Sequence, residues 1–435
     1  MAAKGLAPDA PELLQPVVKS GWGGKLLAGI LGLCVIWGLV AYGDELMNGL
    51  GVTGMRDYFS WGNYIATFIF FVGVAMAGTF ISSVLKLSGA TWSHPIARMG
   101  EVVTVVALLV GAPMVIVDMG RPDRLLNLLI HGRLASPLIW DVICLTTYLV
   151  GSILYLYLTL IPDMAAAYPY LEGRYPFRAK LYKTLASGWT GSPAQVKLYN
   201  RATQIMAVIL IPVAIAMHTV TAFIFSMTLR EGWHDAIMGP YYVVGAIYSG
   251  TAAIIVAMAI FTKVYHLEKY ITWTHFRRMG YLMLTGGLVY LYMTFDEYIT
   301  PSFDGTKAQQ ALSQSVFTGQ FHGVFWSTIL LTFVPVILVA CARWTGKTGL
   351  IVGGILANIG MWLKRYLIIV PTLANPYLGI QGVPAQYAQY HMTWVEWSVS
   401  GGALAGFILL YFAFSKLFPI VSLWETRETT EQEVA

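Results

Sequence analysis

Three arginines and three aspartates fall within one stretch of 24 residues, between two long apolar runs of the chain. The stretch begins Asp118-Met119-Gly120-Arg121-Pro122-Asp123-Arg124 and continues to His131, Arg133 and Asp141. A carboxyl group shielded from water takes up a proton more readily, and guanidinium groups bind ligand oxygen atoms. These residue types therefore predict a half-buried polar pocket that binds a small oxidisable or charged ligand. The alternative is a network of ion pairs that only fixes the connection.

A second candidate functional residue is His218, which lies two thirds of the way along a later apolar run. Pro212, six residues earlier, should kink that helix. His218 could instead be a core histidine bonded to a neighbouring helix, or a haem ligand. A haem held between two transmembrane histidines needs both at one depth. The other histidines all fall near the ends of apolar runs, which disfavours such a haem: His94, His131, His234, His266, His275, His322 and His391.

A basic pair, Lys364 and Arg365, also lies inside an apolar run. Because a charge within a bilayer is costly, such residues are candidates for function. One interpretation is that Arg365 pairs with Asp118, Asp141 or an oxygen atom of a ligand. The other is that both long side chains extend to the membrane surface.

Glu101 lies 17 residues before Asp118 in the same run, which separates the two by roughly 25 Å along a helix. Gln204, near the start of the His218 run, and Tyr248, in the next run, are further polar groups. Together with ordered water they could form an inward proton route. Alternatively, Glu101 pairs with Arg98 and the other polar groups bond between helices.

Composition indicates that lipid surrounds these residues. Hydrophobic residues make up 57% of the 435-residue chain and charged residues 11%, against roughly 25% charged residues in soluble domains. A backbone in lipid must satisfy its own hydrogen bonds, and the apolar runs reach the roughly 18 residues of a spanning helix. The sequence therefore predicts an all-α protein of the lipid bilayer.

Two other classes of protein fit poorly. The net charge of +5 is small and dispersed, so no nucleic-acid partner is expected. The three cysteines, Cys34, Cys144 and Cys341, are widely spaced and form no CxxC motif. We therefore expect no metal site and no covalently bound redox cofactor in this chain.

We predict about ten transmembrane helices. They span 24–42, 61–86, 98–118, 137–162, 200–228, 239–264, 276–296, 321–342, 348–373 and 398–418. Residues 24–418 thus form one polytopic membrane domain between an N-terminal segment, 1–23, and a C-terminal tail, 419–435. Arg98-Met99-Gly100 and Arg278-Met279-Gly280 open two runs that end at aspartates. Unless the tripeptides match by chance, this predicts two four-helix bundles, spans 2–5 and 6–9, flanked by spans 1 and 10.

Charge in the connections predicts the orientation. The loop 163–199 and the connections after spans 2, 6 and 8 are basic, whereas the opposite connections are acidic or mixed. By the positive-inside rule both termini are cytoplasmic, and the stretch from Asp118 to Asp141 lies near the external face of a bacterial inner membrane.

The order and spacing of several motifs resemble the NrfD/PsrC-type integral membrane subunits of quinone-linked oxidoreductases over nearly the whole chain. The motifs are Asp118 to Arg124, Ser136 to Asp141, Ile161-Pro162-Asp163, His218-Thr219, Gly232-Trp233-His234, Pro240-Tyr241-Tyr242, Gly245 to Gly250, Glu297-Tyr298 and Asn358 to Tyr366. The ten spans are similar to the branch found in alternative complex III, Qrc-type menaquinone reductases and the Dsr membrane complex.

The resemblance implies a subunit of a respiratory complex rather than a stand-alone enzyme. Such a subunit binds quinone near the periplasmic face, with menaquinone favoured, and exchanges electrons with a partner iron–sulfur subunit. Further multihaem cytochrome or molybdopterin-like subunits are expected. Asp118, His218, Asp141, Arg121 and His131 become the candidates for quinone binding and proton exchange. Arg124, Lys364 and Arg365 become supporting charges. A secondary transporter and a purely structural membrane anchor remain alternatives.

Overall fold

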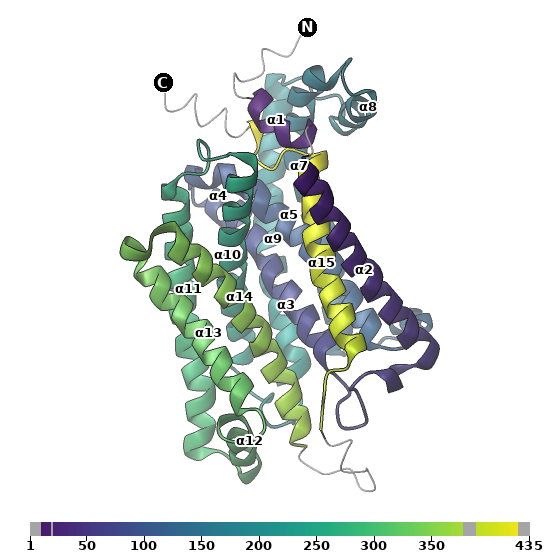
Figure 1. Ribbon diagram of the computed structural model, residues 1–435, viewed down its shortest axis with the longest axis vertical. Helices are drawn as coiled ribbons and strands as arrows, with labels where there is room; N and C mark the ends of the chain where they lie inside the picture. Colours follow the sequence, from purple (N-terminus) through teal and green to yellow (C-terminus); the bar gives the residue numbers. More distant parts are fainter. Residues whose placement is uncertain (1–9, 19–20, 377–388, 425–435) are drawn as a thin grey trace.

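The computed structural model describes residues 10–18, 21–376 and 389–424. These residues form helices and no strand (Figure 1). Nine of the described helices are long and apolar enough to cross a membrane. The prediction of an all-α, multi-pass membrane protein is therefore confirmed.

Each predicted span corresponds to a helical segment. In order, the segments are α2 (Trp22–Asn48), α3 (Asn63–Gly78) continued by η2 (Thr79–Val84) and α4 (Leu85–Leu87), α5 (His94–Asp118), α7 (Pro137–Leu171), α9 (Pro193–Ser226), α10 (Met238–Tyr265), α11 (Trp273–Asp304), α13 (His322–Ala340), α14 (Ala342–Ala374) and α15 (Trp394–Leu417). Of these, α11 is the one segment not counted among the nine apolar helices. It carries charged residues near both ends and packs against α10 and α13 (Figure 1).

Shorter helices mark the two ends of the molecule. α1 (Ala10–Val18) and α8 (Pro176–Leu185) lie together at one end, called the α8 end (top of Figure 1). α12 (Lys307–Phe317) lies at the other, called the α12 end. The helix α8 was not predicted within the basic loop 163–199. Since α5 begins near the α8 end and runs away from it, Asp118 lies toward the α12 end.

Two groups of four spans pack within themselves and against each other. One contains α3, α5, α7 and α9, and the other α10, α11, α13 and α14. The two bundles meet mainly where α10 packs against α3 and α9, and where α14 packs against α3. This arrangement confirms the predicted pair of four-helix bundles.

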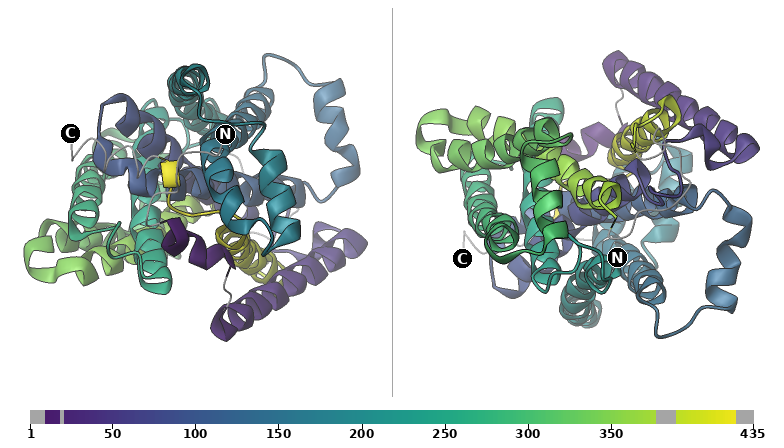
Figure 2. Two further views of the ribbon diagram at one scale, coloured as in Figure 1. Left: turned by 90° about the horizontal axis from the view of Figure 1, so that it is seen from above. Right: turned by 90° about the horizontal axis from the view of Figure 1, so that it is seen from below.

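The first and last spans, α2 and α15, lie side by side at the edge of the molecule (Figure 2). The two helices cross at Gly38 and Gly402, where neither carries a side chain. A Cβ added to Gly38 would lie only 3.0 Å from the Cα atom of Gly402, so the close crossing requires glycine. Near this crossing Trp37 Nε1 donates a hydrogen bond of 2.9 Å to Ser398 Oγ. The pair matches the predicted flanking helices.

The second span changes to a π-helix in η2, where the wider turn alters the pairing of backbone groups. Side chains of neighbouring helices bond to carbonyl groups in and just before this segment. Thr104 Oγ1 donates to Ala75 O at 2.5 Å, and Tyr155 OH donates to Ser82 O at 3.0 Å. The π-helix therefore concentrates polar contacts among α3, α5 and α7.

A buried ion network fastens the α8 end. Arg98 Nη2 lies 3.0 Å from Asp163 Oδ2, and Arg98 Nε lies 3.6 Å from Glu101 Oε2. Thr159 Oγ1 also donates to Glu101 Oε2 at 2.7 Å. The backbone N–H of Trp424 donates to Asp163 Oδ1 at 2.9 Å, so the network ties the segment after α15 to α5 and α7. We call Arg98, Glu101 and Asp163 the inner network.

Candidate functional site

Three buried carboxyl groups converge toward the α12 end. Asp118 is the last residue of α5, Glu45 lies in the last turn of α2 and Glu396 in the first turn of α15. Asp118 lies within electrostatic range of both glutamates. Tyr64 OH donates to Glu45 Oε2 at 2.7 Å, and Tyr390 OH donates to Glu396 Oε1. We call Glu45, Asp118 and Glu396 the acid cluster.

Several polar atoms of this region have no hydrogen-bond partner among the described residues. They are Glu45 Oε1, Asp118 Oδ1 and Asn63 Oδ1. Glu396 differs, because its Oε2 accepts hydrogen bonds from the backbone N–H groups of Gly54, at 2.7 Å, and Thr393, at 3.1 Å. Buried polar atoms normally have partners, so the free oxygen atoms indicate a place for water, a proton or a ligand. Because a charge is costly within a bilayer, the buried carboxyl groups of Glu45 and Asp118 are candidates for function.

The tyrosine next to Glu396 is suited to donating a hydrogen bond. Burial, with a further contribution from the charge of Glu396, raises the pKa of Tyr390. Its hydroxyl group also accepts a hydrogen bond of 2.8 Å from the backbone N–H of Asn63. Tyr390 therefore joins the start of α3 to the start of α15.

An apolar groove runs along the membrane-spanning part of α3, α10, α14 and α15. Its volume is about 640 Å³, and most of its lining is aliphatic or aromatic. The polar lining residues include Thr67 and Ser400, whose hydroxyl oxygen atoms lie 3.4 Å apart. Asn63 Nδ2 donates to Ser400 Oγ at 2.8 Å. Because Asn63 also bonds to Tyr390, a short chain of polar groups leads from the groove to the acid cluster.

A second polar group surrounds Arg365, between the two bundles. The Arg365 guanidinium is buried, and its Cζ atom lies 4.8 Å from the centre of the Tyr242 ring. A Cβ added to Gly245 would lie 3.2 Å from Arg365 Nη2, so glycine leaves room for the guanidinium. The described residues offer no hydrogen-bond partner to Arg365 Nη1, Tyr242 OH, Tyr290 OH or His218 Nε2. We call these four residues the arginine centre.

The neighbouring Lys364 has a different role. Its Nζ atom lies 2.5 Å from Glu297 Oε2 and 2.9 Å from Tyr298 OH. Lys364 and Arg365 are both buried among helices, so the interpretation that they extend to the membrane surface is wrong. Neither Asp118 nor Asp141 lies within ion-pair distance of Arg365 in the described structure.

The stretch from Asp118 to Asp141 divides into buried and exposed parts. Asp141 is buried and accepts a hydrogen bond of 2.6 Å from Thr221 Oγ1. In contrast, Arg121 pairs with Asp123 at 2.9 Å on the surface, where its hydrogen bonds lower the pKa of Asp123. Arg124 and His131 are also exposed. They flank α6 (Leu125–Ile130), in a segment that extends away from the bundles (Figure 2).

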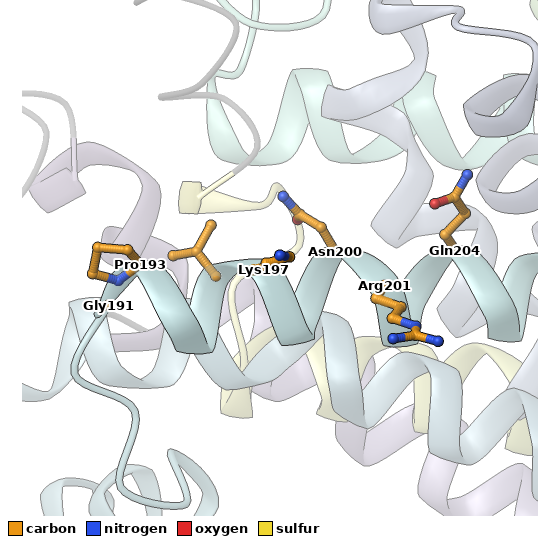
Figure 3. A pocket seen from close by; sticks show the side chains of 7 residues that line it. Gly191, Pro193, Lys197, Asn200, Arg201 and Gln204 are labelled. Atoms are coloured by element: carbon orange, nitrogen blue, oxygen red, sulfur yellow. The ribbon is translucent and has the colours of Figure 1, made fainter.

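The residues predicted for an inward proton route are separated. Glu101 belongs to the inner network. Tyr248 is buried between α10 and α13, where it donates to Thr332 O at 3.0 Å and stacks on Tyr290. Gln204 is exposed and lines a surface depression on α9 (Figure 3).

Two members of the acid cluster, Glu45 and Glu396, are not among the site residues that the sequence predicts. Glu45 follows the first apolar run and resembles an ordinary acidic loop residue. Glu396 forms a capping box with Thr393, and this Thr-x-x-Glu spacing is a usable signal for the start of a helix. Among the described residues, no three His, Cys, Asp or Glu side chains are arranged to hold a metal ion.

Comparison with known proteins agrees with this architecture. The chain is 26% identical to the putative dimethyl sulfoxide reductase membrane subunit of Halobacterium salinarum, over 92% of this chain and 86% of that protein. It is 27% identical to the menaquinone reductase integral membrane subunit of Nitratidesulfovibrio vulgaris, over 88% and 89%. It is 21% identical to the Hdr-like menaquinol oxidoreductase integral membrane subunit of Archaeoglobus fulgidus, over 92% and 95%. Residues 51–376 match the family described as polysulphide reductase, NrfD. The chain therefore belongs to the NrfD family of membrane subunits of reductases, as the motifs predicted.

Proposed function

We propose that this chain is the quinone-binding membrane subunit of a respiratory oxidoreductase complex. The observation that carries the proposal is the apolar groove whose polar groups lead to buried carboxyl groups. A quinone has the same two parts, an apolar isoprenoid tail and a ring with two oxygen atoms. Two relatives are named for menaquinone reductase and menaquinol oxidoreductase, which favours menaquinone.

The residues of the site fit a quinone ring. Thr67, Ser400 and Asn63 offer hydroxyl and amide groups at the groove, and Asn63 Oδ1 has no partner among the described residues. A bound quinol supplies two electrons and two protons to its surroundings. Asp118 Oδ1 and Glu45 Oε1 are free to accept such protons, directly or through water. Around the site, packed helices exclude bulk water, and the arginine centre supplies positive charge between the bundles.

We place this site near the periplasmic face of a bacterial inner membrane, with both termini in the cytoplasm. Basic residues of the loop 163–199 favour a cytoplasmic location for the α8 end. The partner iron–sulfur subunit would then dock at the α12 end, where Arg124 and His131 are exposed. Multihaem cytochrome or molybdopterin-like subunits would complete the complex.

A transporter or a structural anchor would behave differently on purification. The proposal requires that affinity-tagged chain from its native membrane copurifies with an iron–sulfur protein. A transporter would be recovered alone or as a homo-oligomer. An anchor would copurify with partners, yet the complex would keep full activity after neutralisation of both Asp118 and His218. Recovery without any iron–sulfur or haem protein would reject the proposal.

The groove provides a test of tail binding. Ala253 of α10 lines it, and replacement by phenylalanine should fill part of its volume. We expect Ala253→Phe to raise the apparent KM for a long-tailed quinol by about tenfold or more. The KM for a quinol without an isoprenoid tail should change little. Steady-state turnover of the purified complex with both substrates measures the difference.

The matched control is Ala259→Phe, which adds the same ring to the same helix outside the groove. It should leave both KM values near those of the wild type. If Ala253→Phe affected the two quinols equally, or not at all, the groove would not hold the tail.

The proposed function includes an inward proton route from Glu101 toward the acid cluster. Polar groups between Glu101 and the acid cluster include Ser152 of α7, whose hydroxyl group is buried without a partner among the described residues. Tyr148 OH of α7 and Thr79 Oγ1 of η2 lie 2.8 Å apart in the same region. Such groups support a water-filled route better than Gln204 does.

Vesicles containing the whole complex would test that route. We expect Glu101→Gln to lower the number of protons released per electron without changing the chemistry of quinol oxidation. Release is measured with a pH-sensitive dye during a limited number of turnovers. An unchanged ratio, fully explained by quinol oxidation alone, would remove Glu101 from proton transfer.

A further inference from the structure

A depression at the α8 end presents basic side chains to the membrane surface. It has a volume of about 670 Å³ and lies along the first turns of α9 (Figure 3). Its lining comprises Gly191, Pro193, Val196, Lys197, Asn200, Arg201 and Gln204, with no carboxylate. The four long polar side chains are exposed, and within the described residues none forms a hydrogen bond or ion pair. The depression therefore carries two positive charges that this part of the chain does not neutralise.

The position of these charges along α9 gives their depth. Lys197, Arg201, Gln204 and Val208 follow one another at helical spacing, so they share one face of the helix. Val208 is 54% exposed although it is apolar, which identifies this face as lipid-facing. Arg201 lies seven residues before Val208, or roughly 10 Å along the helix. α9 has 34 residues, more than the roughly 20 needed to cross the hydrocarbon, and Arg201 lies within its first three turns, so we place the guanidinium at the level of the lipid headgroups.

Aromatic residues beside the depression support the same depth. Trp189 precedes Gly191, and its ring lies 5.5 Å from that of Tyr199 and 5.8 Å from that of Trp424. Tryptophan and tyrosine concentrate where a bilayer meets water. At this depth Lys197 and Arg201 lie beside the phosphate groups of the lipids.

We infer that this depression binds the headgroup of an anionic phospholipid, with the acyl chains along the apolar face of α9. Lys197 and Arg201 contact the phosphate, since a guanidinium matches its oxygen atoms and an ammonium adds a second charge. Asn200 and Gln204 supply amide donors to the remaining headgroup oxygen atoms. The exposed Ile205 and Val208 provide the surface for the chains.

Native mass spectrometry of the full chain in detergent tests this inference, with dioleoylphosphatidylglycerol and dioleoylphosphatidylcholine as probes. We expect the double variant Lys197→Gln, Arg201→Gln to bind phosphatidylglycerol about tenfold more weakly, with binding of phosphatidylcholine unchanged. The charge-conserving variant Lys197→Arg should keep the binding, which separates loss of charge from misfolding.

The matched control is Lys263→Gln, Arg277→Gln, which removes two exposed positive charges at the same end of the molecule. The affinity of this control variant for phosphatidylglycerol should stay within about twofold of the wild-type value. An equal loss in both double variants would show a general effect of charge and overturn the assignment. The assignment would also be overturned if phosphatidylglycerol bound to a chain that ends at Trp424 but not to the full chain. In that case the acidic residues 425–435, and not a lipid, would occupy the depression.

Discussion

Asp118→Asn should abolish quinone-linked turnover while the complex still assembles. Asparagine keeps the volume and one acceptor of the carboxyl group but cannot take up a proton at Oδ1. Asp118 is buried within electrostatic range of Glu45 and Glu396, and Glu396 ends the polar chain from the groove. Loss of a proton-exchanging group lowers rates by about 100-fold to 10,000-fold. Quinol-dependent reduction of the natural acceptor by the purified complex measures the loss.

Asp123→Asn is the control for this substitution. Asp123 lies only five residues away but is exposed and paired with Arg121. Turnover should therefore stay near the wild-type value. Retention of the partner subunit on purification must be equal in both variants. Normal turnover of Asp118→Asn would remove this residue from the proposed chemistry.

The largest effect on stability is expected at the inner network. Arg98→Met removes the guanidinium that lies 3.0 Å from Asp163 and 3.6 Å from Glu101. Because all three residues are buried, the two carboxylates would remain in a low-dielectric region without that cation. Breaking a buried ion pair on one side costs about 3–5 kcal/mol. The free energy of unfolding, measured by titrating the purified protein with sodium dodecyl sulfate, should fall by this amount.

Arg278→Met provides a control at the equivalent position of the second bundle. Arg278 is exposed and lies over the Trp92 ring at 5.4 Å, so its loss should cost about 1 kcal/mol or less. Adding Asp163→Asn to Arg98→Met should restore part of the lost stability, since it removes one stranded charge. Similar losses for Arg98→Met and Arg278→Met would contradict the role of the inner network.

The architecture could be predicted from the sequence because it depends on local composition. Apolar runs of sufficient length must be helical in lipid, and every predicted span has a helix. The burial of Asp118, Asp141 and His218 is consistent with the same reasoning. Their catalytic roles remain predictions.

The acid cluster was harder to predict because small shifts in helix ends decide it. The first span was expected to end at residue 42, whereas α2 continues to Asn48 and includes Glu45. The last span was expected to begin at 398, whereas α15 begins at Trp394 and includes Glu396. Only packing of the chain's two ends brings these glutamates to Asp118. Likewise, hydropathy gives the depth of Gln204 and Arg365 but not the direction in which each side chain points.

The pairing of α2 with α15 has a consequence for how the protein is made. Trp37 and Ser398 are 361 positions apart, yet their side chains bond to each other. At about 5–20 residues per second, a ribosome needs roughly 20–70 s to add the intervening chain. During that interval the first helix has entered the bilayer but lacks its neighbour, so its glycine-lined surface must be shielded by lipid or by the insertion machinery. Maturation can finish only after translation has almost ended, and premature termination would leave α2 without its partner.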